Sequence, residues 1–172
     1  MNIALIGMPG TMKTSVGKAL SEMTGMRFID TDEEFEREEG RKISEVFATD
    51  GEEYFRARET ETVKRVAAEN GCVISCGGGV VLREENVDAL RSGCAIVLLT
   101  ATAECIFERT SHSLARPLLA GGGFDRIKRM TAERAGAYEA AAQYVFDTTD
   151  RVPRDIAEEI TEKLGLRLKL KQ

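Results

Sequence analysis

A short glycine-rich stretch, GMPGTMKT at residues 7–14, ends in a lysine and a threonine. In the pattern G-x-x-x-x-G-K-[ST], backbone N–H groups surround phosphate, the lysine reaches the β- and γ-phosphates, and the hydroxyl ligates Mg²⁺. Gly7, Lys13 and Thr14 fit, but Met12 stands where the pattern requires glycine. A sparsely populated backbone conformation costs about 1–3 kcal/mol, so we expect weaker nucleotide binding. This stretch alone also fits an ordinary strand-to-helix turn.

Two aspartates follow the next apolar run, in the stretch FIDTDEEFE. Strand spacing predicts that Asp30 and Asp32 share a face, although a turn after the strand would separate them. One carboxylate near Thr14 is suited to hold Mg²⁺ through water, and the other to accept a proton from an attacking hydroxyl. The same residues also suit the cap and the first turn of a helix.

A third group combines a charged pair with three glycines. Arg56 and Glu59 are three residues apart in YFRARE, where the acid can orient a guanidinium that grips a carboxylate or phosphate. A plain surface ion pair is the commoner meaning of that spacing. Gly77, Gly78 and Gly79 follow a later apolar run, which indicates close approach of either a ligand or another chain segment.

The elements that must position these residues follow from the apolar pattern. Runs at 2–6, 26–30, 72–76, 94–99 and 144–148 alternate with helical patterns at 14–23, 51–70, 125–142 and 153–164. This alternation predicts a parallel sheet with helices on both faces. Ligands of such sheets bind beyond the carboxyl ends of the strands, so we expect the chemistry in the loops after the first three runs.

Length and composition narrow the class of protein. The 172 residues suit a single domain, and a net charge of −5 argues against a nucleic-acid binder. The four cysteines fit no metal spacing, so we expect reduced core residues in a cytoplasmic protein rather than disulfides or metal ligands. The first apolar run lacks a basic flank, and no apolar stretch is long enough for a bilayer, so we expect no signal peptide and no membrane partner.

Six segments together resemble one family. GMPGTMKTSVGKAL, FIDTDEEFE, ISEVFATDGEEYFRARE, CGGGVV, RPLLAG and ERAGAYEAAA are similar to shikimate kinase in order and spacing, across nearly the whole chain. The resemblance implies an α/β fold of the P-loop, nucleoside-monophosphate-kinase type: a three-layer α/β/α sandwich around a five-stranded parallel sheet. It implies Mg²⁺-dependent transfer of the ATP γ-phosphoryl group to the 3-hydroxyl of shikimate, in aromatic amino acid biosynthesis. We expect one monomeric domain over 1–172, with a lid at 110–124.

The resemblance also assigns residues on the nucleotide side. Lys13 would contact the transferring phosphate, Thr14 would ligate the magnesium, and Asp30 would hold it through water. Arg116 resembles a lid arginine that closes over the phosphates and takes part in catalysis. Arg109 resembles an arginine that lies against the nucleotide, and Arg151 and Pro153 resemble an adenine-side loop. The nucleotide-binding set is Gly7, Pro9, Gly10, Thr11, Met12, Lys13, Thr14, Ser15, Arg109, Arg116, Arg151 and Pro153.

On the acceptor side, Asp32 resembles an aspartate that faces the reacting hydroxyl and acts as the base. Arg56 and Arg134 match arginines that bind the shikimate carboxylate, and Glu59 matches the acid that orients the first of them. Gly78 would supply a backbone contact. The acceptor-binding set is Asp32, Arg56, Glu59, Gly77, Gly78, Gly79 and Arg134.

Two alternatives remain open from the sequence. One is a related P-loop kinase for another small hydroxylated acceptor, such as gluconate. The other is a non-catalytic binding protein of the same type, supported by Met12. His112, the single histidine, lies in the expected lid, where we interpret it as a loop residue rather than a base, and Gly121–Gly123 would provide the hinge.

Overall fold

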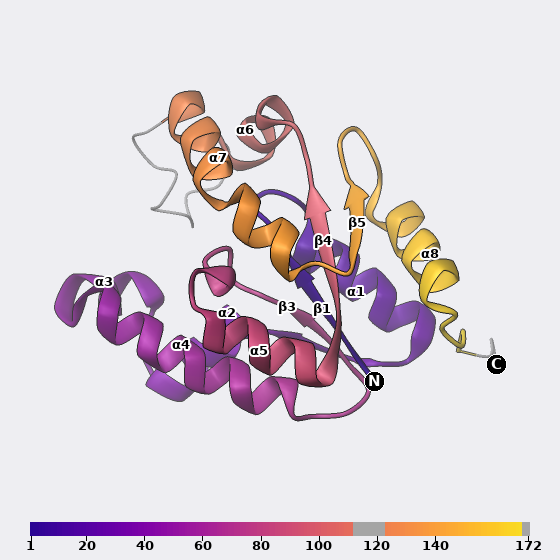
Figure 1. Ribbon diagram of the computed structural model, residues 1–172, viewed down its shortest axis with the longest axis horizontal. Helices are drawn as coiled ribbons and strands as arrows, with labels where there is room; N and C mark the ends of the chain where they lie inside the picture. The colour runs from indigo at the N-terminus through magenta and orange to yellow at the C-terminus, as the bar shows by residue number, and fades with distance from the viewer. Residues whose placement is uncertain (112–122, 170–172) are drawn as a thin grey trace.

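The computed structural model describes residues 1–111 and 123–169 as a parallel β-sheet between helical layers (Figure 1). The five strands lie in the order β2-β3-β1-β4-β5, and every pair is parallel. All five predicted strands are confirmed, as β1 (Asn2–Ile6), β2 (Arg27–Asp30), β3 (Cys72–Ser75), β4 (Cys94–Thr100) and β5 (Tyr144–Asp147). The α/β class and the P-loop type of sheet are thus as expected.

The predicted helices are confirmed to within a few residues at their ends. They are α1 (Lys13–Thr24), α4 (Gly51–Ala67), α7 (Gly123–Ala141) and α8 (Pro153–Leu164). The structure adds α2 (Thr31–Glu39), α3 (Ile43–Thr49), α5 (Glu84–Gly93), α6 (Ala103–Ser111) and a 3₁₀ turn, η1 (Val80–Leu82). Over residues 1–111 and 123–169, no helix is long and apolar enough to span a bilayer.

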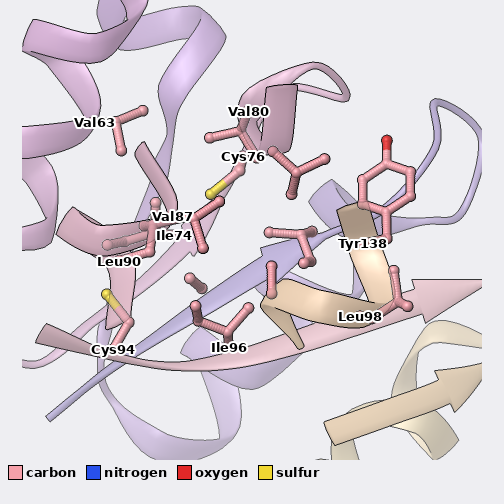
Figure 2. Close-up of a cluster of buried hydrophobic side chains, with 14 of the residues drawn as sticks. Val63, Ile74, Cys76, Val80, Val87, Leu90, Cys94, Ile96, Leu98 and Tyr138 are labelled. Atoms are coloured by element: carbon pink, nitrogen blue, oxygen red, sulfur yellow. The ribbon is translucent and has the colours of Figure 1, made fainter. Parts of the chain in front are cut away.

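Two apolar clusters fix the layers. In β1, Ala4 and Ile6 point into a cluster covered by α4, α5 and α7, shown in Figure 2. The alternate residues Ile3 and Leu5 point to the opposite face, where α1 and α8 pack. Because β1 is buried on both faces, it reads as a continuous apolar run rather than as an alternation. Because β1, β2 and β3 are neighbouring parallel strands, their carboxyl ends lie at the same edge of the sheet.

A third cluster joins α2, α3 and α4. The Phe55 ring lies 4.9 Å from the Phe35 ring and 4.7 Å from the Phe47 ring, between centroids. Buried Val46 completes the contact. This packing holds the first turns of α4, and with them Arg56, against α2 and α3.

The cysteines and methionines are packing residues. All four cysteines are free and buried, as expected. Burial raises the pKa of the Cys76 thiol well above its usual value and that of Cys94 to about 11, so both stay protonated at neutral pH. Met8 belongs to the first apolar cluster, and Met12 packs against the second.

Candidate active site

The loop between β1 and α1 has the backbone of a phosphate-binding turn. Gly7 and Gly10 have φ of 144° and 86°, and a Cβ on Gly7 would collide with the carbonyl oxygen of Leu99. The Lys13 ammonium curls over the loop and donates to the Gly7 carbonyl at 2.9 Å and the Met8 carbonyl at 3.0 Å. Residues 7–14, hereafter the phosphate loop, thus place a buried cation at the N-terminus of α1.

Met12 adopts the conformation that the pattern reserves for glycine. Its φ of 66° and ψ of 23° are left-handed, and it caps the N-terminus of α1. Its carbonyl accepts from the Val16 N–H at 2.8 Å, as the first hydrogen bond of the helix. The expected unfavourable conformation is confirmed, and packing of the thioether side chain against the second apolar cluster offsets part of its cost.

Asp30 caps helix α2 and also contacts the phosphate loop. Its Oδ2 accepts from the Thr14 hydroxyl at 3.2 Å, while its Oδ1 accepts from the N–H groups of Asp32 and Glu33 at 3.0 and 3.4 Å. The capping interpretation of Asp30 is therefore correct, and it fixes the carboxylate beside the phosphate loop. Strand spacing does not relate Asp30 to Asp32, because β2 ends at Asp30 and Asp32 lies in the first turn of α2.

Arg56 and Glu59 form a buried pair, so a surface ion pair is the wrong interpretation. Arg56 Nη1 lies 2.8 Å from Glu59 Oε2, and the two residues are only 8% and 4% exposed. Burial raises the pKa of Glu59, while Arg56, Arg134 and Arg83 act in the opposite direction. Arg56 Nε is buried without a hydrogen bond, with the exposed Glu52 carboxylate 3.5 Å away. Such a desolvated cation is poised to bind a further anion.

Each residue of the triple glycine leaves room for a neighbouring group. A Cβ on Gly77 would lie 2.7 Å from Asp32 Oδ1, and one on Gly78 would lie 2.9 Å from Pro9 Cδ. A Cβ on Gly79 would collide with the guanidinium of Arg56. The sequence left open whether a ligand or another chain segment approaches these glycines. On the side where a Cβ would stand, the neighbour is another chain segment at all three positions.

Helix α7 closes the arrangement from the other side. The Gly78 carbonyl accepts from Arg134 Nη1 at 3.1 Å and from the Tyr138 hydroxyl. Asp32, Arg56, Glu59 and Arg134, gathered around residues 77–79, are hereafter the acceptor cluster. Since Pro9 also packs on Gly78, this cluster lies against the phosphate loop.

Sequence reasoning missed two hydroxyl groups that hold these glycines. Tyr138 is one turn beyond Arg134 on α7, and that four-residue spacing is the signal that pairs them. The Thr31 hydroxyl accepts from the Gly77 N–H at 3.0 Å, for which the sequence carries no local signal. Burial raises the pKa of the Tyr138 phenol, so it remains a hydrogen-bond donor.

Arg109 connects the phosphate loop to the segment after β5. It donates to the Gly10 carbonyl at 3.1 Å, and to the hydroxyl and carbonyl of Thr148 at 3.0 and 2.6 Å. Arg151 instead pairs with Glu159 of α8 at 2.6 Å, and Pro153 is the first residue of that helix. The described residues expected on the nucleotide side thus come from the phosphate loop, from α6, and from the segment between β5 and the start of α8.

Part of the expected lid lies outside the described residues. Arg116, His112 and most of the expected 110–124 segment fall there, as do Gly121 and Gly122. Gly123, with φ of 55°, begins α7, and the 110–111 end of the segment belongs to α6.

Comparisons with known proteins bear on this arrangement. Residues 9–165 match the family model described as "Shikimate kinase". A shikimate kinase of Symbiobacterium thermophilum is 42% identical over 167 residues, which cover 95% of this chain and 96% of that one. The solved structure of a shikimate kinase from Acinetobacter baumannii, in complex with shikimate, superposes with a TM-score of 0.92 at 32% identity, covering 95% of this chain and 92% of the other.

A more distant likeness concerns the fold alone. A gluconokinase from Sinorhizobium meliloti superposes with a TM-score of 0.62 at 20% identity, covering 95% of this chain and 91% of that one. At such identity only the arrangement of strands and helices is shared, so the likeness lends no support to a gluconate acceptor.

Proposed function

Because this chain belongs to the shikimate kinase family, we propose that its phosphate loop binds ATP and that its acceptor cluster binds shikimate. The chain is an ATP-dependent kinase that acts on shikimate. The observation that carries the assignment of residues is the contact between the two sites, through Pro9 and Gly78. Phosphoryl transfer needs a donor and an acceptor held in line, and little covalent chemistry from the protein.

On the donor side, backbone N–H groups of the phosphate loop and the N-terminus of α1 surround the phosphates. Lys13 exchanges its carbonyl partners for the oxygens of the transferring group, whose charge it stabilises in the transition state. Arg109, anchored to Gly10 and Thr148, lies against the nucleotide, and Arg151 and Pro153 border its base. Arg116, which lies outside the described residues, would contact the phosphates, as its match to the family's lid arginine implies.

Thr14 and Asp30 fit the role of a magnesium site. The hydroxyl and carboxylate oxygens are hard ligands 3.2 Å apart, and Mg²⁺ in kinases takes few protein ligands, completing its shell with water and phosphate oxygens. Since Asp30 Oδ1 is occupied by the cap of α2, Oδ2 is the atom that would be available to hold Mg²⁺ through water. When bound, Mg²⁺ would neutralise charge on the phosphates.

On the acceptor side, Arg56 and Arg134 bind the shikimate carboxylate. Glu59 holds Arg56 in place and occupies one of its nitrogens, leaving the rest of the guanidinium for the ligand. Asp32, against Gly77, accepts the proton of the 3-hydroxyl as that oxygen attacks phosphorus. Arg56 and Arg134 thus orient the shikimate ring through its carboxylate, and the position of Asp32 determines which hydroxyl group reacts.

The two alternatives are not favoured. The relatives are shikimate kinases, and Met12 keeps the backbone in the glycine conformation, so the loop has not lost its shape. A coupled ADP-release assay tests the proposal, with shikimate and gluconate offered separately. We expect turnover that depends on shikimate. Tight shikimate binding without turnover, or preference for gluconate, would contradict the proposal.

We further propose that the enzyme is a cytoplasmic monomer. Free, buried cysteines suit a reducing compartment, and the net charge of −5 disfavours a nucleic-acid partner. Sedimentation at two protein concentrations tests the oligomeric state, and a mass that rises with concentration would contradict it.

A further inference from the structure

The arginines of this protein divide into two groups. Ten of those in the ranges 1–111 and 123–169 form an ion pair with a carboxylate. Within the same ranges the remaining arginines, for which no ion pair is found, are Arg109, Arg126, Arg129, Arg134 and Arg167. All but the last lie on α6 and α7. Arg126 and Arg129 have no part in the site proposed above.

Arg126 and Arg129 lie on α7, the helix that also carries Arg134. Together with Met130 and Glu133 the three arginines line one open cleft. Arg126 and Arg129 are three residues apart and are therefore neighbours on the helix surface. At about 1.5 Å of rise per residue, Arg129 and Arg126 are about 8 and 12 Å along the axis from Arg134. Figure 1 shows α7 running from beside α6 to the start of β5, so Arg126 and Arg129, in the first two turns of α7, lie on the α6 side of Arg134.

The charge of this cleft opposes that of the whole protein. Three guanidinium groups face one carboxylate, Glu133, whereas the chain carries a net charge of −5. Arg129 is exposed, while Arg126 and Arg134 are partly buried. Among the described residues neither Arg126 nor Arg129 has an ion-pair partner, and a cleft lined mainly by one sign of charge raises the local concentration of the opposite ion. At about 0.1 M salt this field reaches about 10 Å.

We infer that Arg126 and Arg129 form an electrostatic approach path that draws the anionic acceptor along α7 to Arg134. The inference rests on the proposed function, in which Arg134 binds the carboxylate of shikimate. Arg126 and Arg129 act through their field and do not touch the bound acceptor. They raise the rate at which shikimate is captured and leave the phosphoryl-transfer step unchanged.

The double variant R126Q/R129Q tests this path, since glutamine keeps polarity and removes charge. Coulomb's law in water over about 10 Å gives roughly a twofold effect per charge. We therefore expect kcat/KM for shikimate to fall about fourfold at about 20 mM salt and less than about 1.5-fold at about 300 mM salt. The kcat and the KM for ATP should stay within about twofold of the parent. If the double variant unfolds, R129Q alone changes only an exposed side chain and should give about half the logarithmic effect.

A matched control is R154Q/K163Q, which removes the same charge from exposed positions of α8, on the other face of the sheet. It should leave kcat/KM for shikimate unchanged at both salt concentrations. An equal fall in the control would mean that net charge alone matters, and a loss that persists at high salt would mean a packing role. Either result overturns the inference, as does a fall confined to ATP or no fall at all.

Failure of the inference is distinguishable from failure of the proposed function. The unmodified chain must first release ADP in a shikimate-dependent manner. Absence of that turnover contradicts the assignment of the acceptor cluster. Normal turnover of the parent with no salt-dependent loss in R126Q/R129Q contradicts the approach path alone.

Discussion

The phosphate loop and the acceptor cluster are formed by different kinds of chemical group. The loop is built from backbone: left-handed dihedrals at Gly10 and Met12, and carbonyls that accept from Lys13. The acceptor cluster is built from charged side chains pressed against glycines, with Arg56 and Glu59 almost fully buried. A backbone site tolerates an unusual side chain that leaves the chain path intact. A site made of close-packed charges tolerates neither an added carbon nor a lost charge.

This contrast ranks the expected effects of substitution. Changes in the acceptor cluster should have the larger effects on the reaction of shikimate and leave ATP binding unchanged. Changes at Met12 should alter the KM for ATP by a small factor and leave kcat/KM for shikimate unchanged.

Asp32→Asn should have the largest effect. Asparagine keeps the size of the side chain but cannot take up the proton, and a positioned general base contributes about 10²–10⁴-fold. We expect kcat to fall by about that factor while ATP affinity, measured by calorimetry, is unchanged. If ATP binding is lost instead, Asp32 belongs with the metal ligands and the division between the two sites is wrong.

Gly79→Ala should come next, because its Cβ would occupy the position of the Arg56 guanidinium. Losing a charge-assisted hydrogen bond of about 1.5–3 kcal/mol corresponds to roughly a 10–100-fold fall in kcat/KM for shikimate. Gly136→Ala is the matched control, since nothing lies within 4 Å of its Cβ. Equal losses in both variants would show that the glycines of the cluster have no special role.

Glu59→Gln should raise the KM for shikimate by up to about tenfold, because a neutral amide orients Arg56 less well. Burial raises the native pKa of Glu59 above 4.5, so in the parent shikimate affinity should fall as pH drops through that raised value. The variant should lack this decline, whereas Glu52→Gln, at an exposed partner of Arg56, should retain it. A decline that persists in Glu59→Gln belongs to another group.

The same raised pKa has a consequence for stability. The native state binds the Glu59 proton more tightly than the unfolded chain does. The resulting stabilisation of the native state is complete below pH 4.5 and is lost as the pH rises through the native pKa. The free energy of unfolding of Glu59→Gln should therefore vary less with pH than that of the parent. Denaturant unfolding across this range measures the difference.

The sequence predicts the backbone-built site better than the side-chain site. Strands such as β1 and β4 are recognisable because burial on both faces makes them continuous apolar runs. The phosphate loop follows β1 directly and opens α1, so the order of strand, loop and helix adds to what the imperfect motif indicates. Short helices such as α3, with seven residues, carry too few turns to show a period.

The acceptor cluster depends on contacts between distant segments. The spacing of Arg56 and Glu59 indicates a pair but not its burial, to which the distant glycines Gly77 and Gly79 contribute by packing against it. Likewise, the contact between Arg134 and Gly78 spans residues on α7 and after β3. Only the resemblance to a family joined these segments before the fold was known, because local pattern contains no information about tertiary contact.

Met12→Gly should have the smallest effect and tests the tolerance of the backbone-built site. Glycine relieves a left-handed conformation that costs a larger residue about 1 kcal/mol or more, but it also gives up the packing of the thioether on the second apolar cluster. We expect the KM for ATP to fall about two- to fivefold, with kcat/KM for shikimate unchanged at saturating ATP.

Met12→Ala is the matched control, because it keeps the Cβ and its unfavourable backbone and loses the same packing. If strain limits nucleotide binding, only the glycine variant gains affinity for ATP. If both variants lose affinity equally, the methionine side chain itself supports the loop. Unchanged ATP affinity and turnover in both variants would mean that the loop binds phosphate through its backbone alone. The left-handed conformation of Met12 would then have no effect on nucleotide binding.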